Sequence, residues 1–254
     1  MKALIAIPTY NEAESLPSIV ARARAAVPEA DILVVDDNSP DGTGKLADDL
    51  ALEDSHIHVL HRAGKEGLGR AYIAAFRWAM DRDYSHVVEM DADGSHRPEQ
   101  LPLLLERAAM SDYPDLVIGS RYVRGGAMEG WPKSREMLSR AGNLYIKAWL
   151  GIPVNDVTAG FRVYRIAMLQ RMELEGVESK GYFFQTDMTD RVNLLDGHIV
   201  EMPINFAQRE AGESKLSGSI FTESFLKATS MGAKRRGEQL KEFSRSVVSR
   251  LRRS

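Results

Sequence analysis

Short apolar runs alternate with segments of helical periodicity through the first half of the chain. The expected strands are residues 3–7, 31–36, 56–60, 86–90 and 116–118, and the expected helices are residues 12–26, 43–52 and 67–80. Strands that alternate with helices of this length form βαβ units around a parallel sheet. The sequence therefore predicts an α/β fold with a mainly parallel central sheet flanked by helices.

Two residues near the start set the expected boundaries of the first strand and the first helix. Pro8 is expected to end the strand, because proline has no backbone N–H to donate. Asn11 is expected to cap the helix, because its side chain accepts hydrogen bonds at helix starts.

Polar residues follow four of the expected strands, in segments 8–12, 36–37, 91–93 and 119–121. The carboxyl ends of parallel strands meet at one edge of the sheet, where α/β proteins bind their ligands. The sequence therefore predicts one binding site at this edge.

Asp91 and Asp93 flank Ala92 directly after an expected strand. Side chains alternate along an extended segment, so both carboxylates point to the same side. Two like charges this close repel each other unless a cation lies between them. Mg²⁺ or Mn²⁺ suits such a site, since hard ions take carboxylate and phosphate oxygens. A solvated acidic turn is the alternative, and the position after a strand favours the metal.

Several other site types lack their sequence signatures. Asp36 and Asp37 could contact a nucleotide or cap the following turn, but no GxGxxG follows the first strand and no GxxxxGK[ST] occurs. The absence of GxSxG and HExxH disfavours a serine hydrolase and a zinc protease. The chain has no cysteine, which excludes disulfides, thiolate metal sites and cysteine nucleophiles.

Composition narrows the class of protein further. The 254 residues suit one large domain, or one domain with a tail, and the net charge of −3 disfavours nucleic-acid binding. No apolar stretch is long enough to span a membrane, and none resembles a signal peptide. The expected location is therefore cytoplasmic.

Eight separate stretches together resemble the dolichol-phosphate (polyprenol-phosphate) mannose synthases, which are inverting GT-A glycosyltransferases. The resemblance extends from Ile5 to about Met231, and the later stretches are more specific than the earlier ones. The matching segments are IPTYNE at 7–12, VVDDNSPDGT at 34–43, GLGRAY at 67–72, MDAD at 90–93, GSRY at 119–122, WPKSR at 131–135, TAGFR at 158–162 and GESKL at 212–216.

The resemblance implies a reaction and the residues that carry it. Mannose passes from GDP-mannose to the phosphate of a membrane polyprenyl lipid, with Mg²⁺ or Mn²⁺ as the cofactor. The implied donor-binding residues are Pro8, Tyr10, Glu12, Val35, Asp37, Asp91, Ala92, Asp93, Arg209 and Lys215. Asp91 and Asp93 also hold the metal. The implied acceptor-phosphate residues are Arg121, Arg135 and Ser139, and the implied catalytic residues are Asp93, Arg121, Arg135 and Asp187.

The sequence departs from the family pattern at two points. Gly94 and Ser95 follow the acidic pair where relatives usually have a larger residue and then Gln or Ser. Asp187 stands where relatives often have Glu, which shortens the reach of that carboxylate.

Three other functions are compatible with parts of this pattern. A UDP-glucose or UDP-GlcNAc enzyme acting on the same lipid is the nearest, because guanine and uracil contacts cannot be separated from the sequence. A non-catalytic nucleotide-sugar-binding subunit is disfavoured by the intact acidic and basic residues. A nucleotidyltransferase is expected to carry a Gly-rich, basic N-terminal loop, which residues 8–12 do not provide.

The C-terminal end differs in charge from the rest. Residues 234–254 hold eight basic and two acidic residues. We expect a GT-A domain over residues 1–231 and a basic tail over residues 232–254. The tail is either an amphipathic helix on an anionic membrane surface or a terminal helix packed on the domain. The resemblance also implies a peripheral position on the cytoplasmic face of a membrane, and a small membrane partner protein.

Overall fold

The computed structural model describes residues 1–177, 181, 183–208, 226–234 and 236. The strands in this part of the chain are β1 (Ala3–Thr9), β2 (Asp31–Asp36), β3 (Ile57–His61), β4 (His86–Glu89), β5 (Leu116–Ser120), β6 (Ala127–Met128), β7 (Arg162–Arg165), β8 (Ile199–Pro203) and β9 (Asn205–Phe206).

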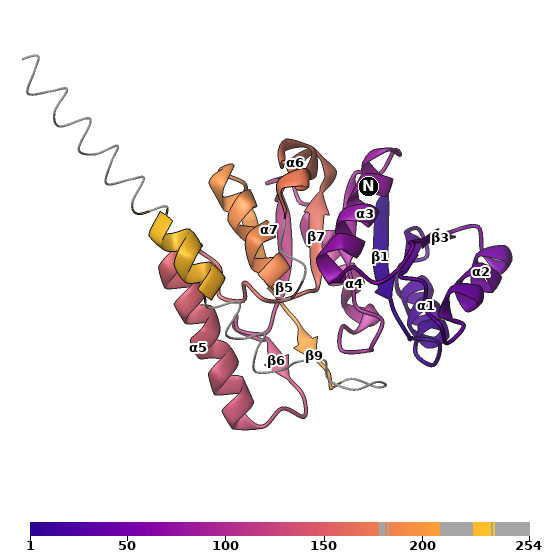
Figure 1. The fold of residues 1–254 in the computed structure, drawn as a ribbon, viewed down its shortest axis with the longest axis horizontal. Coiled ribbons are helices and arrows are strands. Elements are labelled where there is room, and N and C mark those ends of the chain that lie inside the picture. Colours follow the sequence, from indigo (N-terminus) through magenta and orange to yellow (C-terminus); the bar gives the residue numbers. More distant parts are fainter. Residues whose placement is uncertain (178–180, 182, 209–225, 235, 237–254) are drawn as a thin grey trace, which may run out of the picture.

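Seven of these strands form the central sheet, in the order β3-β2-β1-β4-β7-β5-β8 (Figure 1). β7 runs antiparallel to β4 and to β5, and every other pairing in this sheet is parallel. β6 and β9 pair in a separate two-stranded sheet. The predicted α/β fold with a mainly parallel sheet is confirmed.

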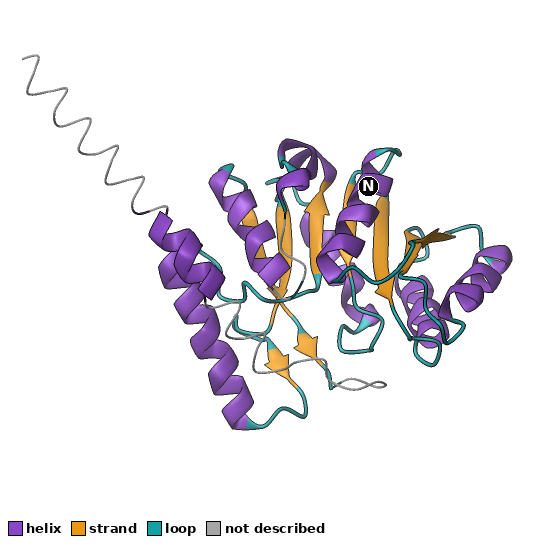
Figure 2. Ribbon diagram, viewed as in Figure 1, coloured by secondary structure: helices purple, strands orange, loops and turns teal. Residues whose placement is uncertain are grey.

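Helices cover both faces of the central sheet (Figure 2). Alternate strand residues supply the two cores: Leu4 and Ala6 of β1 belong to one cluster, and Ile5 and Ile7 belong to the other. The α-helices are α1 (Leu16–Ala26), α2 (Thr43–Glu53), α3 (Leu68–Met80), α4 (Leu101–Ala108), α5 (Lys133–Leu150), α6 (Ile166–Arg171) and α7 (Phe183–Leu194). Core residues of α1, α2 and α4 pack in one cluster, whereas those of α3, α5, α6 and α7 pack in the other.

The prediction that Pro8 ends the first strand is wrong, because β1 continues to Thr9. The carbonyl of Ala6 accepts from Met90 on the β4 side, so alternation points the nitrogen of Pro8 to the same side. β4 ends at Glu89, opposite Ala6. No residue of β4 therefore lies opposite the nitrogen of Pro8, so its missing N–H costs the sheet no hydrogen bond to β4.

Asn11 does not cap the first helix either. Its φ is 58°, in the left-handed region, and α1 begins only at Leu16. Pro17 lies in the first turn of α1, where a missing N–H leaves no hydrogen bond unmade. Asn11 instead forms part of the turn that follows β1.

Residues 226–234 are helical and lie beside α5. The Tyr145 hydroxyl is 2.6 Å from that of Thr229, and the Arg236 guanidinium lies 4.5 Å from the Trp149 ring centroid. Ala228 is fully buried and belongs to the core cluster that includes residues of α5. In its described part this C-terminal segment packs on the domain; residues 237–254 lie outside the described residues, so the division at residue 231 stays a prediction. None of the described helices is long and apolar enough to cross a bilayer.

Candidate active site

The order of the strands reverses beside β1, since β2 lies on one side of it and β4 on the other. Loops at the carboxyl ends of β1, β2, β4 and β5 begin at this edge, which is the place where open α/β sheets bind ligands. All four polar segments singled out in the sequence begin there.

The residues expected to hold the nucleoside of the donor come from β1, β2 and the loops that follow them. Pro8 pairs in register with Val35, and the backbone N–H of Asp37 donates to the carbonyl of Thr9 at 3.1 Å. The two strand ends therefore diverge only after Thr9 and Asp37.

Beyond β1, Tyr10 and Glu12 are each held by a neighbour. The Lys65 ammonium lies 4.2 Å from the centroid of the Tyr10 ring. The backbone N–H of Glu12 donates to Oγ1 of Thr43 at 3.0 Å, which ties the loop to the start of α2. Tyr10 and Glu12 thus both lie in the loop at this edge.

Asp37 forms an ion pair with Arg62, which follows the end of β3. Burial raises the pKa of the Asp37 carboxyl and Arg62 lowers it, and the balance lies above its usual value. Arg62 was not among the expected site residues. Its position directly after a strand of the same parallel set was the signal that could have identified it.

The acidic pair lies at the end of β4, with Asp93 buried and Asp91 partly exposed. The Tyr72 hydroxyl donates to Oδ1 of Asp91 at 3.3 Å, and burial with the nearby carboxylate raises the pKa of Tyr72. Tyr72 therefore stays protonated as a donor. Oδ1 of Asp93 accepts from the backbone N–H of Ser95 at 3.0 Å and from its hydroxyl.

His96 supports this acidic loop from behind. Its Nδ1 accepts the backbone N–H of Asp91 at 3.0 Å and lies 3.7 Å from Oδ2 of Asp91. The ring stacks on Phe161 with centroids 5.1 Å apart and meets Phe206 edge-on at 5.5 Å. His96 was not among the expected site residues.

The donor set at Asp91 and Asp93 fits a hard divalent cation. The described residues contain no cluster of three or more acidic or histidine ligands. Mg²⁺ does not require one, because it is usually held by one or two carboxylates, water and substrate phosphates. Two carboxylates at a nucleotide-binding edge match that pattern.

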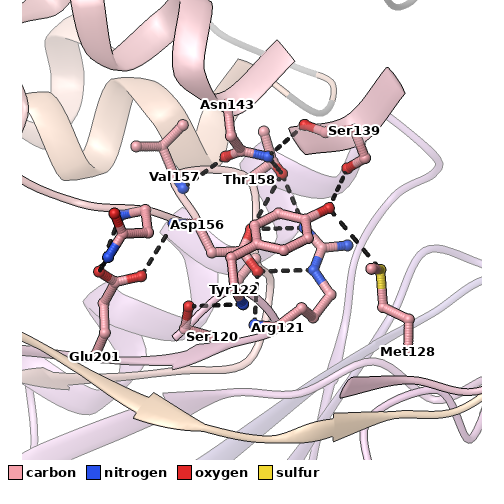
Figure 3. A network of polar contacts seen from close by, with 12 residues as sticks. Ser120, Arg121, Tyr122, Met128, Ser139, Asn143, Asp156, Val157, Thr158 and Glu201 are labelled. Carbon is pink, nitrogen blue, oxygen red and sulfur yellow. Dashed lines mark hydrogen bonds and ion pairs between the residues drawn. The ribbon is translucent and has the colours of Figure 1, made fainter. Parts of the chain in front are cut away.

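The three expected acceptor residues gather around two aromatic rings. The Arg121 guanidinium lies 5.2 Å from the Tyr122 ring centroid, and the Tyr122 hydroxyl donates to Ser139 Oγ at 2.6 Å (Figure 3). Arg135 stacks on the Trp131 ring, with Cζ 3.9 Å from its centroid. No carboxylate in the described part of the chain pairs with Arg135.

Arg121 pairs with a buried carboxylate that the sequence did not point to. Its Nε and Nη2 donate to the two oxygens of Asp156 at 2.7 and 2.6 Å. Burial alone would lower the pKa of Arg121, but the Asp156 charge outweighs it and raises the pKa above its usual value. The guanidinium is therefore permanently charged.

Phe206 connects the acidic half of the site to the arginine half. Its ring meets His96 on one side and lies 5.3 Å from the Arg121 guanidinium on the other. It also meets Trp131 edge-on, with centroids 5.8 Å apart. The two halves of the predicted site therefore lie next to each other.

Asp187 lies in α7 and is buried, with Nε of Arg191 donating to its Oδ1 at 3.0 Å. Phe184, one turn earlier, stacks on Tyr72 with centroids 6.1 Å apart. Tyr72 in turn contacts Asp91, so α7 begins close to the acidic pair. Arg209 and Lys215, expected to bind the diphosphate, lie outside the described residues.

Comparisons with known proteins agree with this arrangement. The sequence model of glycosyl transferase family 2 matches residues 4–172. An undecaprenyl-phosphate mannosyltransferase of Micrococcus luteus is 56% identical over 241 residues, covering 95% of this chain and 98% of the relative. A polyprenol monophosphomannose synthase of Mycolicibacterium smegmatis is 51% identical over 236 residues, covering 92% of this chain and 88% of the relative.

Among solved structures, a mannosyltransferase from Pyrobaculum calidifontis in complex with GDP-Man and Mn²⁺ superposes with a TM-score of 0.61. The sequences are 16% identical, and the match covers 92% of this chain and 64% of that one. At this identity the likeness shows the fold, which is the GT-A glycosyltransferase fold.

Proposed function

Because the chain belongs to glycosyl transferase family 2, we propose that it transfers mannose from GDP-mannose to the phosphate of a membrane polyprenyl lipid. The observation that carries the proposal is the adjacency of an acidic strand end, Asp91 to Asp93, and an arginine cluster, which are linked through contacts of His96 and Phe206. The names of the two relatives, which match nearly the whole chain, support mannose as the sugar and a polyprenyl phosphate as the acceptor.

The donor half of the site would hold the nucleotide and its metal. Pro8, Tyr10, Glu12, Val35 and Asp37 would line the nucleoside side, while Asp91 and Asp93 would hold Mg²⁺ or Mn²⁺. When bound, the metal stabilises the negative charge that develops on the departing nucleotide. The Mn²⁺ and GDP-Man in the Pyrobaculum structure support both assignments.

The acceptor half would supply charge and orientation, with no need for a strong base. A phosphate monoester has a second pKa of about 6, so it is largely dianionic at neutral pH. Arg121 and Arg135 would direct the phosphate, and Ser139 would lie beside it. An oxygen of the acceptor phosphate would attack the anomeric carbon in line, and the bond from that carbon to GDP would break, which converts the α-linked donor to a β-mannosyl phosphate. Asp187 would orient the sugar or the arginines.

The outer face of α5 supports a lipid acceptor. Met137, Leu138 and Leu144 are 70%, 53% and 68% exposed on the helix that also carries Arg135 and Ser139. Lys133 and Arg140 on the same helix add basic charge. Exposed apolar side chains beside basic ones are typical of helices that lie in a membrane interface.

We therefore propose that the protein lies on a membrane with the outer face of α5 in the interface; the cytoplasmic side rests on the family resemblance alone. The polyprenyl chain would then lie in the lipid while its phosphate reaches Arg121 and Arg135. The proposed small membrane partner rests on the family resemblance alone.

The test is mannose transfer from GDP-mannose to a short polyprenyl phosphate in detergent, with Mn²⁺, with Mg²⁺ and with a chelator. UDP-glucose serves as the parallel donor. The expected result is metal-dependent mannolipid from GDP-mannose and little or no product from UDP-glucose. If product formed from UDP-glucose and not from GDP-mannose, the proposed location of the site would still hold, but the proposed donor would be wrong. No product from either donor until membranes are restored would indicate that the partner is required.

A further inference from the structure

Among the described residues, the hydrogen bonds of Arg121 engage two of its three guanidinium nitrogens and leave the third for a ligand. Asp156 accepts from Nε and Nη2, and Thr158 Oγ1 accepts a second bond from Nη2 at 2.9 Å. Figure 3 shows the remaining nitrogen, Nη1, pointing away from Asp156 towards the side where Ser139 and Met128 lie. The orientation of the guanidinium plane is therefore set by the loop that carries Asp156.

Asp156 is itself fixed on several sides. Its side chain is fully buried, and Oδ2 also accepts the backbone N–H of Arg121 at 2.9 Å. Its own backbone N–H donates to the Glu201 carboxylate at 3.0 Å, which anchors the loop to β8. Because these bonds fix the Asp156 carboxylate in place, the guanidinium of Arg121 cannot turn without losing its bonds to it.

The neighbouring residues fix the same loop to α5. Asn143 Oδ1 accepts the backbone N–H of Val157 at 2.8 Å, while its amide donates to Thr158 Oγ1 at 3.2 Å. The same amide donates to the carbonyl of Ser139 at 3.0 Å. The loop that orients Arg121 is thus joined to the helix that carries Ser139 (Figure 3).

The ion pair also changes what Arg121 can offer. Because the Asp156 charge lies within hydrogen-bonding distance, Arg121 contributes little net charge to an incoming anion. Arg135 has no acidic partner among the described residues, and the ion pair of Arg140 with Glu136 lies at the surface, where ion pairs are weak. These two arginines can supply net positive charge, whereas Arg121 supplies direction.

We propose that Asp156 is a positioning residue of the transfer reaction, which holds Arg121 so that Nη1 alone donates to the acceptor phosphate. This inference rests on the proposed function, since it assigns the acceptor to the arginine side of the site. Asp156 touches neither substrate and acts through Arg121. Arg121 then aligns the phosphate for attack, and Arg135 with Arg140 balances its charge.

The test compares Asp156→Asn with the native full-length chain in the detergent transfer assay. The variant keeps one oxygen for the backbone N–H of Arg121 but loses the charge and one acceptor. Freed from its partner, Arg121 becomes a net cation that is poorly aligned. The expected result is a kcat lowered about tenfold or more, with the acceptor KM unchanged or lower and GDP affinity unchanged.

Asp115→Asn is the matched control. Asp115 is also buried and pairs with an arginine, Arg165, at the opposite end of β5. Its substitution perturbs a comparable ion pair without touching the site. The expected result is a lower melting temperature with kcat and acceptor KM within about twofold of the native values.

A double substitution separates positioning from a structural role. If Asp156 acts through Arg121, adding Asp156→Asn to Arg121→Gln lowers kcat no further than Arg121→Gln alone. Should Asp156→Asn not fold, Thr158→Val removes one bond to Nη2, keeps the ion pair, and is expected to lower kcat about threefold with the same unchanged KM.

Additive effects in the double substitution, or a full kcat in Asp156→Asn, would overturn the inference. So would equal losses of acceptor and GDP affinity. The proposed function is judged separately, by whether the native chain makes mannolipid at all.

Discussion

The backbone N–H of Asp91 donates to Nδ1 of His96 at 3.0 Å, and the same nitrogen lies 3.7 Å from the Asp91 carboxylate. A ring nitrogen that accepts a hydrogen bond carries no proton, so the tautomer that makes this bond has its proton on Nε2. Stacking against Phe161 fixes the plane of the ring. His96 thus holds the backbone from which the first proposed metal ligand projects.

Replacing His96 should weaken metal binding, and the loss should be smaller when the new side chain can still accept the hydrogen bond from the Asp91 N–H. His96→Leu leaves the N–H of Asp91 without its partner and should raise the Mn²⁺ concentration for half-maximal transfer about tenfold or more. His96→Asn places an oxygen near the position of Nδ1 and should lose less. The two variants are compared by Mn²⁺ titration of the transfer rate, and equal responses would contradict this role.

Because Glu89 is buried, we expect the free energy of unfolding of the metal-free protein to depend on pH. Burial raises the pKa of Glu89 from 4.5 to about 8, against the opposing effects of Arg162 and Gln185. Between these two values the folded state binds more protons than the unfolded state, so stability falls as pH rises through that window. Above pH 8 both states are ionised and the loss is complete.

Glu89→Gln removes this titration. The melting temperature of the variant relative to the native chain should therefore increase steadily between pH 5 and pH 8, measured with a chelator present. Melting curves that shift in parallel across this range would show that the buried carboxyl does not titrate as described.

Arg135→Gln should affect the acceptor and leave the donor alone. Arg135 stacks on Trp131 and has no acidic partner in the described structure, so its loss removes a charge-assisted bond to the phosphate without leaving a buried charge behind. The acceptor KM should rise about tenfold, corresponding to about 1.4 kcal/mol. Calorimetry with GDP and Mn²⁺ provides the control, and a matching loss of GDP affinity would place Arg135 in the donor half.

The outer face of α5 should govern membrane binding. Met137 and Leu144 are seven residues apart on one face of the helix, so replacing both with Gln removes apolar area without disturbing the core. Cosedimentation with phosphatidylcholine–phosphatidylglycerol vesicles should weaken about tenfold. Gln at the exposed Leu52 and Met110 is the matched control, and equal weakening by both pairs would exclude α5 as the docking face.

The parallel strands of the sheet could be predicted because apolar runs and helical periodicity are local features of the sequence. The apolar run of β2 was placed with its observed bounds, and Asp91 with Asp93 follow β4 as the strand-end rule requires. Pro8 was misjudged because the effect of a missing N–H depends on where the neighbouring strand stops. The expected helix cap at Asn11 was wrong because asparagine is favoured both at helix caps and in left-handed turns, so the residue type alone does not distinguish the two.

The arginine side of the site was only partly predictable. Arg121 and Arg135 were identified through the family resemblance, but the pairing of Arg121 with Asp156 joins residues 35 positions apart. Nothing in the spacing of a sequence specifies such a contact, which depends on β7 folding back between β4 and β5. The apolar outer face of α5 was likewise missed, since its meaning depends on which face the core buries.

The most direct test of the central claim is mannolipid formation by Asp93→Asn compared with Asp48→Asn, an exposed aspartate on α2. Loss of a metal-binding carboxylate removes a contribution of several kcal/mol to the transition state. Asp93→Asn should therefore lower the transfer rate about a thousandfold with Mn²⁺ present, while the melting temperature is retained and Asp48→Asn transfers mannose at the native rate. A folded Asp93→Asn variant that makes mannolipid at near-native rate would contradict the assignment of this edge of the sheet as the site of transfer.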